Sequence, residues 1–467
     1  MWSGATLPTA TPPGSPARSQ SETTVDLEAL VKQIRPDFVP AAAYVRPEFV
    51  QLEKAMLWPH TWLMACREEQ VGKPGQFFVF DIADESILIV RSSDGRLRAF
   101  HNVCPHRGRR LKDGTGETGD SISCRFHAWA WNTAGKCKFV LNPEDWDETG
   151  GLSDVDLTEV RLDRWAGWIF VTLDLEIEPL ADYLDPLPAV FANFDYENTR
   201  LAWHNTLIVD CNWKVALEAF LESYHVHGTH PQSLKFGVRK PYSKGFGKHS
   251  MFAYPFTRPP ERAPGDPPVD YRQARYDYVE EMNRTLGALW GAHGLKAAKR
   301  LLDELPADAS FDEVNAAFVR FHAEAMEADG ARYPSQVTPE DLARAGTAWN
   351  IFPNVVVLPT LDGWQGYRAR PNGDNPDSAI FEAWWLERSA PDAPSTVEPK
   401  YFASMEAFKG QNFFLEQDFD NIKAVQQGLK SSAFKGARPN PKQEATIFTF
   451  ERNYYQHLLA PRGETHG

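Results

Sequence analysis

Four cysteine and histidine residues lie in two short segments with a spacing that can bind metal. Cys104 and His106 belong to CPHRGRRL, and Cys124 and His127 belong to CRFHAWAWNTAGK. Two thiolates and two imidazoles can close a tetrahedral zinc site, or they can hold a [2Fe–2S] cluster with both cysteines on one iron and both histidines on the other. The spacing by itself leaves both alternatives open.

A second group of candidate ligands lies further along the chain, in NWKVALEAFLESYHVHGTH (212–230). His225 and His230 are five residues apart, which on a continuous helix would turn their side chains roughly 140° away from each other. Both can face one ion only where the helix ends or bulges between them, and Gly228 permits this. Two imidazoles and one carboxylate form the facial triad that leaves open positions on Fe(II).

The two segments together resemble the Rieske-type ring-hydroxylating oxygenases, and specifically their alpha (large, terminal oxygenase) subunit. The residues around Cys104 and Cys124 resemble the cluster-binding motif, and residues 212–230 resemble the signature of the catalytic domain, in the order of that family. The resemblance implies a [2Fe–2S] cluster and one mononuclear Fe(II). The implied cluster ligands are Cys104, His106, Cys124 and His127, and two of the implied ligands of the mononuclear iron are His225 and His230.

Asp418 is the candidate for the third ligand of the mononuclear iron. It lies in NFFLEQDFDNIKAVQQGLKSS, a segment that resembles the late helix of the family, in which an Asp ligand precedes a Gln-x-Gly element. Glu416 and Asp420 are the alternatives. Asp420 lies two positions further along the same helix and therefore points to another face, where a solvated carboxylate is the ordinary interpretation.

Glu222 is the remaining candidate catalytic residue. It precedes His225 by three residues, so on a helix its side chain projects close to that imidazole and can accept a hydrogen bond from its free N–H. The family architecture places the Rieske site of one subunit against the mononuclear iron of its neighbour. We therefore expect Glu222 to bridge electron transfer from His106 or His127 of the partner subunit. A structural salt bridge or a solvated carboxylate is the alternative.

The elements that must position these residues read as an α+β fold, with an all-β Rieske [2Fe–2S] domain followed by an antiparallel-sheet catalytic domain covered by helices. Residues 76–100 alternate apolar and polar side chains around an Asp94-Gly95 turn, which predicts a hairpin within a Rieske domain at 45–175. Residues 180–455 form the expected catalytic domain. Its predicted strands are 202–209, 350–358, 366–370 and 379–386, and its predicted helices are 213–226 and 401–427.

Three further segments complete the predicted organisation. Residues 1–25 are rich in Pro, Ser, Thr and Ala and are expected to form a disordered tail, and short helices are expected between 27 and 62. Residues 257–347 are predicted to be a helical insert. A capping box at Ser310, and a cap at Thr338 followed by Pro339 at the first helical position, mark the starts of two of its helices. The insert either caps the substrate pocket or decorates the surface.

Composition excludes several classes of function. The 49 basic and 63 acidic residues give a net charge of −14 without a run of Lys and Arg, so nucleic-acid binding is not expected. No apolar stretch is long enough for a membrane span and no signal segment is recognisable, which favours a cytoplasmic protein. Five cysteines in 467 residues are too few for a disulfide framework.

The resemblance implies an oxidoreductase that uses O2 and electrons from NAD(P)H, delivered through a separate reductase, a ferredoxin or both. It implies hydroxylation, once or twice, or demethylation of an aromatic or other hydrophobic substrate, as in aromatic hydrocarbon catabolism. It also implies a homotrimer, with or without a small beta subunit. Ala219 and Glu222 depart from residues common in dioxygenases of the family, so the choice between dihydroxylation, monohydroxylation and demethylation stays open. The alternative is a non-catalytic metal-binding or electron-carrier protein.

Overall fold

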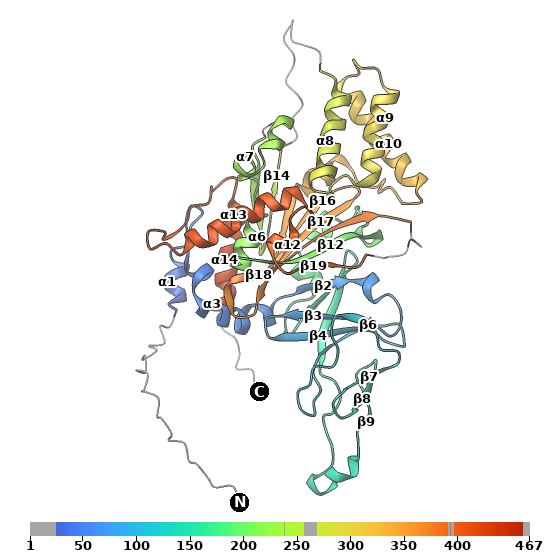
Figure 1. Ribbon diagram of the computed structural model, residues 1–467, viewed down its shortest axis with the longest axis vertical. Coiled ribbons are helices and arrows are strands. Elements are labelled where there is room, and N and C mark those ends of the chain that lie inside the picture. Colours follow the sequence, from blue (N-terminus) through green and yellow to red (C-terminus); the bar gives the residue numbers. More distant parts are fainter. Residues whose placement is uncertain (1–24, 238, 256–268, 391–392, 394–396, 461–467) are drawn as a thin grey trace, which may run out of the picture.

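The computed structural model describes residues 25–237, 239–255, 269–390, 393 and 397–460. Figure 1 shows a lower lobe made mainly of strands and a larger upper part in which helices surround a sheet. The predicted tail and the Pro-rich start of the insert lie outside the described residues. Within the described part, no helix is long and apolar enough to cross a membrane.

The lower lobe contains a seven-stranded and a three-stranded sheet. The larger sheet has the order β2-β11-β10-β5-β4-β3-β6 and is antiparallel throughout. Its strands are β2 (Leu63–Arg67), β3 (Gln76–Ile82), β4 (Glu85–Arg91), β5 (Leu97–His101), β6 (Thr115–Glu117), β10 (Glu159–Trp165) and β11 (Trp168–Thr172). The smaller sheet pairs β7 (Ser121–Ser123), β8 (Ala130–Asn132) and β9 (Cys137–Phe139).

The predicted hairpin at Asp94-Gly95 connects β4 to β5. Gly95 has φ +81°, a conformation that favours glycine, and the Gly95 N–H donates to the Ser92 carbonyl at 2.8 Å. The alternation seen in the sequence places Phe77 and Val79 in the interior, with Phe78 between them more exposed. The predicted strands are confirmed, but both faces of the sheet pack against a core, since Phe80 and Ile82 on the opposite face are buried too.

The upper part is built on an eight-stranded sheet with the order β13-β14-β15-β16-β17-β18-β12-β19. Every neighbouring pair is antiparallel except β12 and β19. The strands are β12 (Thr199–Val209), β13 (Tyr242–Phe246), β14 (His249–Ala253), β15 (Ala348–Ile351), β16 (Val355–Pro359), β17 (Gly363–Asn372), β18 (Asn375–Arg388) and β19 (Lys400–Phe402). The predicted antiparallel-sheet architecture is confirmed.

Helices pack around this sheet and connect it to the lower lobe. The helices of this part are α4 (Leu180–Tyr183), α5 (Leu187–Val190), α6 (Trp213–Glu218), α7 (Val226–Thr229), α12 (Met405–Phe408), α13 (Phe413–Leu429) and α14 (Ala445–Leu459), and those near the N-terminus are α1 (Leu27–Val31), α2 (Ala42–Val45) and α3 (Pro47–Leu52). A two-residue pairing of β1 (Val39–Pro40) with β20 (Gly436–Ala437) ties the N-terminal segment to the region before α14. One continuous apolar core joins residues of both lobes.

The insert forms a helical group at the upper right of Figure 1. It comprises α8 (Tyr271–Thr285), α9 (Gly291–Glu304), α10 (Phe311–Ala328) and α11 (Pro339–Ala345). Both predicted helix starts are confirmed, since the Ser310 hydroxyl accepts from Glu313 N–H and the Thr338 hydroxyl accepts from Asp341 N–H.

Three predicted elements were wrong in their extent. The predicted strand 350–358 is two strands, because Phe352–Asn354 form a turn that folds β16 back on β15. The predicted helix 401–427 is a strand followed by two helices, because Ser404 and Asn412 each cap a new start. The predicted helix 213–226 ends at Glu218. Periodicity alone did not reveal these interruptions.

Candidate metal centres and an adjoining cavity

The two predicted cluster loops have the same backbone hydrogen bonds. The N–H of Cys104 donates to Arg109 O and the N–H of Cys124 donates to Trp129 O, both at 2.8 Å. The residue four positions after each cysteine, Gly108 or Ala128, adopts positive φ and donates its N–H back to the cysteine carbonyl. Each loop is therefore a tight turn that brings its cysteine and histidine to the same side.

The four side chains fit a group that they would hold together. The His106 and His127 rings lie 4.6 Å apart between centroids, and the buried Nδ1 atom of each has no hydrogen-bond partner. Both cysteines are 2% exposed and free of disulfide bonds, and backbone N–H groups of His106 and Arg107 point at the Cys104 sulfur. Unpartnered buried imidazole nitrogens facing two buried thiols match the donor set of a [2Fe–2S] cluster.

The Asn-Trp-Lys motif fixes the segment that leads to the second site. The Asn212 side chain accepts from Lys214 N–H and caps α6. Trp213 donates its indole N–H to Glu53 at 2.8 Å, and the fully buried Lys214 ammonium lies 2.5 Å from the same carboxylate. Helix α6 is thereby anchored to the N-terminal segment, and the chain leaves it through a turn that precedes His225.

His225, His230 and Asp418 come together at one point. Helix α7 is a single turn with His225 at its N-cap and His230 at its C-cap, so the helix ends between the two ligands as their spacing required. Asp418 approaches from α13, and its Oδ1 lies 3.0 Å from His230 Nε2 and 3.6 Å from His225 Nε2. One ligand atom from each of the three residues lies within 4.8 Å of the other two.

The donor set and its surroundings fit a mononuclear iron. His230 is completely buried, and its Nε2 has no hydrogen-bond partner although Asp418 is near, because the ring nitrogen is not aligned with the carboxylate oxygen. An ion between the nitrogen and the oxygen would account for that orientation. The alternatives to Asp418 are occupied elsewhere, since Glu416 accepts backbone N–H groups of Gly410 and Asn412, and Asp420 is exposed.

Glu222 contacts His225 as the sequence predicted, but not along a helix. Its Oε1 lies 2.8 Å from His225 Nδ1, and its Oε2 accepts the His225 backbone N–H at 3.1 Å and that of Tyr224. The chain has left α6 by this point, so a turn rather than a helical repeat brings the two side chains together. The carboxylate orients the imidazole so that Nε2 faces Asp418.

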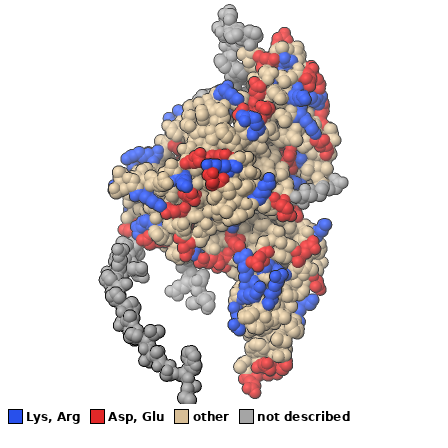
Figure 2. Space-filling model, in the orientation of Figure 1, with Lys and Arg blue, Asp and Glu red and all other residues tan. Residues whose placement is uncertain are grey.

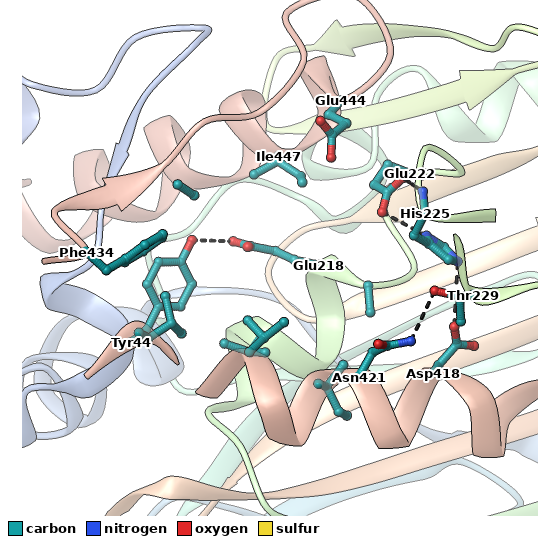
Figure 3. Close-up of a pocket in the computed structure, with 16 residues that line it drawn as sticks. Tyr44, Glu218, Glu222, His225, Thr229, Asp418, Asn421, Phe434, Glu444 and Ile447 are labelled. Atoms are coloured by element: carbon teal, nitrogen blue, oxygen red, sulfur yellow. Dashed lines mark hydrogen bonds and ion pairs between the residues drawn. The ribbon is translucent and has the colours of Figure 1, made fainter. Parts of the chain in front are cut away.

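A cavity of about 290 Å³ opens beside these residues (Figure 3). The iron-ligand candidates His225 and Asp418 form one end, and Tyr44 and Phe434 lie at the other. Among the described residues, its charged lining consists of carboxylates and one imidazole, without Lys or Arg, and the remaining lining is mostly apolar. The lining residues are Tyr44, Val215, Glu218, Ala219, Glu222, His225, Thr229, Asp418, Asn421, Ile422, Val425, Leu429, Phe434, Ala437, Glu444 and Ile447.

Glu218 carries an unusual carboxyl group in the cavity wall. The Tyr44 hydroxyl donates to Glu218 at 2.8 Å and lies 3.2 Å from the buried Glu451. Burial and the neighbouring Glu451 raise the pKa of Glu218 well above its usual range, which favours a proton held between these two carboxyls. Burial also raises the pKa of Glu444, with a further contribution from Glu222.

The sequence did not identify several residues around the second site. Gln417 accepts from His230 Nδ1 at 3.0 Å if that nitrogen carries the proton, and Phe414 stacks on the His230 ring at 3.7 Å between centroids. Adjacency to Asp418 was the only signal available for Gln417. Other large aromatic residues of the catalytic part do not line this cavity, among them Trp203, Phe220, Phe352, Phe408 and Phe414.

Comparison with known proteins agrees with both sites. Residues 61–146 match the Rieske [2Fe–2S] domain, and residues 189–460, more than half of the chain, match the ring hydroxylating alpha subunit (catalytic domain). The carnitine monooxygenase oxygenase subunit of Escherichia coli (strain K12) is 31% identical over 195 residues, which are 41% of this chain and 52% of that protein. The matched part of this chain thus spans about half the length of that relative.

More distant relatives cover nearly the whole chain. The biphenyl dioxygenase subunit alpha of Paraburkholderia xenovorans (strain LB400) is 23% identical and covers 83% of this chain and 79% of its own. The quaternary ammonium Rieske monooxygenase CntA in complex with an inhibitor has a TM-score of 0.62 at 17% identity, covering 92% and 98% of the two chains. Naphthalene 1,2-dioxygenase from Rhodococcus sp. has a TM-score of 0.61 at 18% sequence identity, and the match covers 94% of this chain and 98% of that one. These structures share the fold.

The two matched regions coincide with the two ligand groups found in the structure, the Rieske region with the cysteine and histidine loops and the catalytic region with the two histidines and Asp418. Their order along the chain is the order predicted from the motifs. The chain therefore belongs to the ring-hydroxylating oxygenase alpha subunits, the family whose members carry a Rieske [2Fe–2S] domain and a catalytic domain with a mononuclear iron.

Proposed function

We propose that this chain is the terminal oxygenase component of a multicomponent Rieske oxygenase. The observation that carries the proposal is the convergence of His225, His230 and Asp418 beside a cavity, with Glu222 on the outer nitrogen of His225. The proposed cluster ligands are Cys104, His106, Cys124 and His127. We also propose the division into a Rieske domain at 45–175 and a catalytic domain at 180–455.

The chain's own residues would orient the iron ligands. A bound [2Fe–2S] cluster would supply single electrons, and Fe(II) with open positions would activate O2. Glu222 holds the His225 ring, and Gln417 together with Phe414 holds the His230 ring. Asp418 is buried at the ligand end of the cavity, whereas His225 is partly exposed.

We propose a small organic cation as substrate, in place of the aromatic hydrocarbon that the family resemblance first implied. Relatives of this chain act on carnitine and on glycine betaine. The cavity supports the same class, because Glu218 and Glu444 add carboxyl groups to its wall and no Lys or Arg from the described part of the chain lines it. Tyr44 and Phe434 place aromatic rings at the far end, where a trimethylammonium group packs favourably.

A pair of matched ligands tests this substrate class. A trimethylammonium alcohol should bind more tightly than its neutral tert-butyl analogue, which has nearly the same shape without the charge. The Glu218→Gln variant should narrow that preference about tenfold, since it removes the carboxyl group that a bound cation would ionise. Asp420→Asn, on the exposed side of α13, is the control. Equal binding of the two ligands by the unmodified protein would exclude a cation site.

Binding of a cation should also release protons. A positive charge next to Glu218 favours the carboxylate, so the pair with Glu451 would give up the proton that it holds in the empty cavity. Calorimetry in buffers of different ionisation enthalpy measures this release. The release should disappear in Glu218→Gln and persist in Asp420→Asn, and an unchanged release in Glu218→Gln would assign the proton to another group.

Reductase or ferredoxin partners and a trimer, with or without a beta subunit, complete the proposal. On the face drawn in Figure 2, Lys and Arg side chains gather on the lower lobe. Arg107, Arg110 and Arg125 are exposed next to the cluster loops, where Phe126 is 52% exposed. An acidic electron carrier or the catalytic part of a neighbouring copy fits such a surface. The electron-carrier partner can be tested with ferredoxins of differing charge. The visible absorbance of the cluster would report how fast each one reduces it.

A further inference from the structure

A second group of histidines and carboxylates lies where the helical insert meets the sheet. His293 on α9 and His322 on α10 face Asp362, which lies in the turn between β16 and β17. His322 Nε2 is 2.9 Å from Asp362 Oδ2, and His293 Nδ1 is 3.5 Å from Asp362 Oδ1. We call His293, His322 and Asp362 the junction cluster. One carboxylate thus faces two imidazoles on two different helices.

The junction cluster is buried, so its charge must be balanced locally. Asp362 is 0% exposed, His322 is 1% and His293 is 6%, and neither carboxylate oxygen of Asp362 has a hydrogen bond among the described residues. Arg388 is near, but its guanidinium donates to the carbonyls of Leu361 and Asp195. A buried carboxylate without a cation is strongly unfavourable. The side chains of His293 and His322 are therefore the nearest groups that can stabilise Asp362.

The other charged groups around the junction cluster either raise the pKa of His293, as Asp362 does, or form ion pairs of their own. His293 Nε2 is 3.2 Å from Asp329, which also pairs with Lys296 at 2.5 Å. Glu387 lies 3.7 Å from His293 Nδ1 and accepts the Ala292 N–H at the start of α9. Tyr333 also lies near Asp362. The Asp362 carboxylate raises the pKa of His293, against the opposing effect of burial.

The corner between α8 and α9 connects this junction to the proposed iron site. Leu286 and Ala288 form a small core with Trp385, and Phe414 packs against that core. Phe414 stacks on the ring of His230. The Asn412 side chain donates to Leu286 O at 2.7 Å and at the same time caps α13, the helix that carries Asp418.

The backbone strain and close packing of residues 286–291 indicate that this corner keeps its conformation only while its neighbours hold it in place. Leu289 has φ +77°, in the region that favours glycine, so its backbone persists only where the surroundings impose it. Gly291 has φ +53°, and a Cβ there would lie 2.3 Å from the Glu387 carboxylate. Helix α9 therefore starts directly against the sheet, and any loosening of the junction would free the corner.

We propose that the junction cluster is a clamp that holds the α8–α9 corner against Phe414, and that it thereby positions His230 and α13. Asp362, His293 and His322 are positioning residues, since none of them touches the cavity. The clamp itself is independent of the proposed function, whereas its effect on iron binding rests on it. A metal ion is the less suitable occupant, because within the described residues only His225, His230 and Asp418 bring three ligand atoms within 4.8 Å of one another.

The clamp has a defined dependence on pH. Because the pKa of His293 is raised in the folded protein, its stabilising contribution is complete below the unfolded pKa of about 6.5 and is lost as pH rises through the folded pKa. Docking of the insert should therefore weaken on the alkaline side.

Hydrogen–deuterium exchange on the full chain tests the clamp. After correction for intrinsic exchange, amides of α9, α10 and residues 286–290 should exchange about tenfold faster at about pH 8.5 than at about pH 6. Asp362→Asn should exchange fast at both pH values, and Asp303→Asn, an exposed change on α9, should behave like the unmodified protein. If exchange in Asp362→Asn depends on pH as it does in the unmodified protein, the clamp is wrong. It is also wrong if the unmodified protein holds one additional metal ion per chain that Asp362→Asn lacks.

Retention of the mononuclear iron after gel filtration, with cluster absorbance as internal reference, tests the positioning role. Iron retention should fall with pH in parallel with the exchange of residues 286–290, and Asp362→Asn should lose iron at both pH values. A loosened corner with full iron retention overturns the positioning role. If the unmodified protein binds no iron, the proposed function fails while the exchange data still decide the clamp. Should Asp362→Asn not fold, His322→Gln serves in its place.

Discussion

The two ligand groups of this chain are assembled in different ways. The cysteine and histidine ligands lie on two loops within residues 104–127, and each loop closes on itself with the same hydrogen bonds. The second group joins α7 to α13, which are far apart in the sequence and meet only in the folded chain. The first site is therefore determined mainly by local sequence, and the second depends on the tertiary structure.

The Cys124→Ser variant breaks the local site and should have the largest effect. We expect complete loss of the visible absorbance and of about two irons with two acid-labile sulfides per chain, because a thiolate ligand of the cluster is removed. Cys137→Ser, a change at the start of β9, is the control and should keep the colour. A coloured Cys124→Ser protein would remove this cysteine from the ligand set, and a colourless unmodified protein with zinc would favour the non-catalytic alternative.

The Asp418→Ala variant breaks the tertiary site without disturbing the local one. We expect loss of the single labile iron and of product formation, with an unchanged cluster spectrum, because the two ligand sets share no residue. Iron analysis and absorbance on the same sample measure both. The exposed Asp420→Ala is the matched control on α13. Normal turnover in Asp418→Ala would assign the carboxylate ligand to another residue.

The Glu222→Gln variant sharpens the comparison, since it tests whether the two sites communicate. We expect both metals to be retained and the cluster to be reduced normally, while oxidation of the cluster by substrate and O2 slows about 10- to 100-fold. Single-turnover absorbance measurements follow this step. Oxidation at the native rate would show that electrons reach the iron by a route that does not need the Glu222 carboxylate.

The smallest expected effect is on a locally encoded element remote from both sites. Ser310→Ala removes the side-chain acceptor for Glu313 N–H at the start of α10 and should lower the free energy of unfolding by about 1 kcal/mol. Thermal or urea unfolding measures it, with both metal contents unchanged. A loss several times larger, or a loss of mononuclear iron, would mean that the start of α10 itself supports the insert and its contact with the site.

The sequence by itself determined the features that depend on near neighbours. Residues four apart close the two cluster loops, Gly95 makes the hairpin, and Ser310 and Thr338 start helices, because each relies on hydrogen bonds over a few residues. Motif resemblance added Asp418 and Glu222. In the folded chain Asp418 lies near both histidines and Glu222 contacts His225, and their roles stay predictions.

The tertiary structure alone decided which distant groups share a space. Packing between segments far apart in the chain decided three features. The predicted helix ends at Glu218, and Tyr44 and Glu451 lie close to that residue. Two helices of the insert place histidines against Asp362. Periodicity reports which face of an element is apolar, but it does not report what that face meets. The acidic cavity and the junction cluster therefore became visible only in the folded chain.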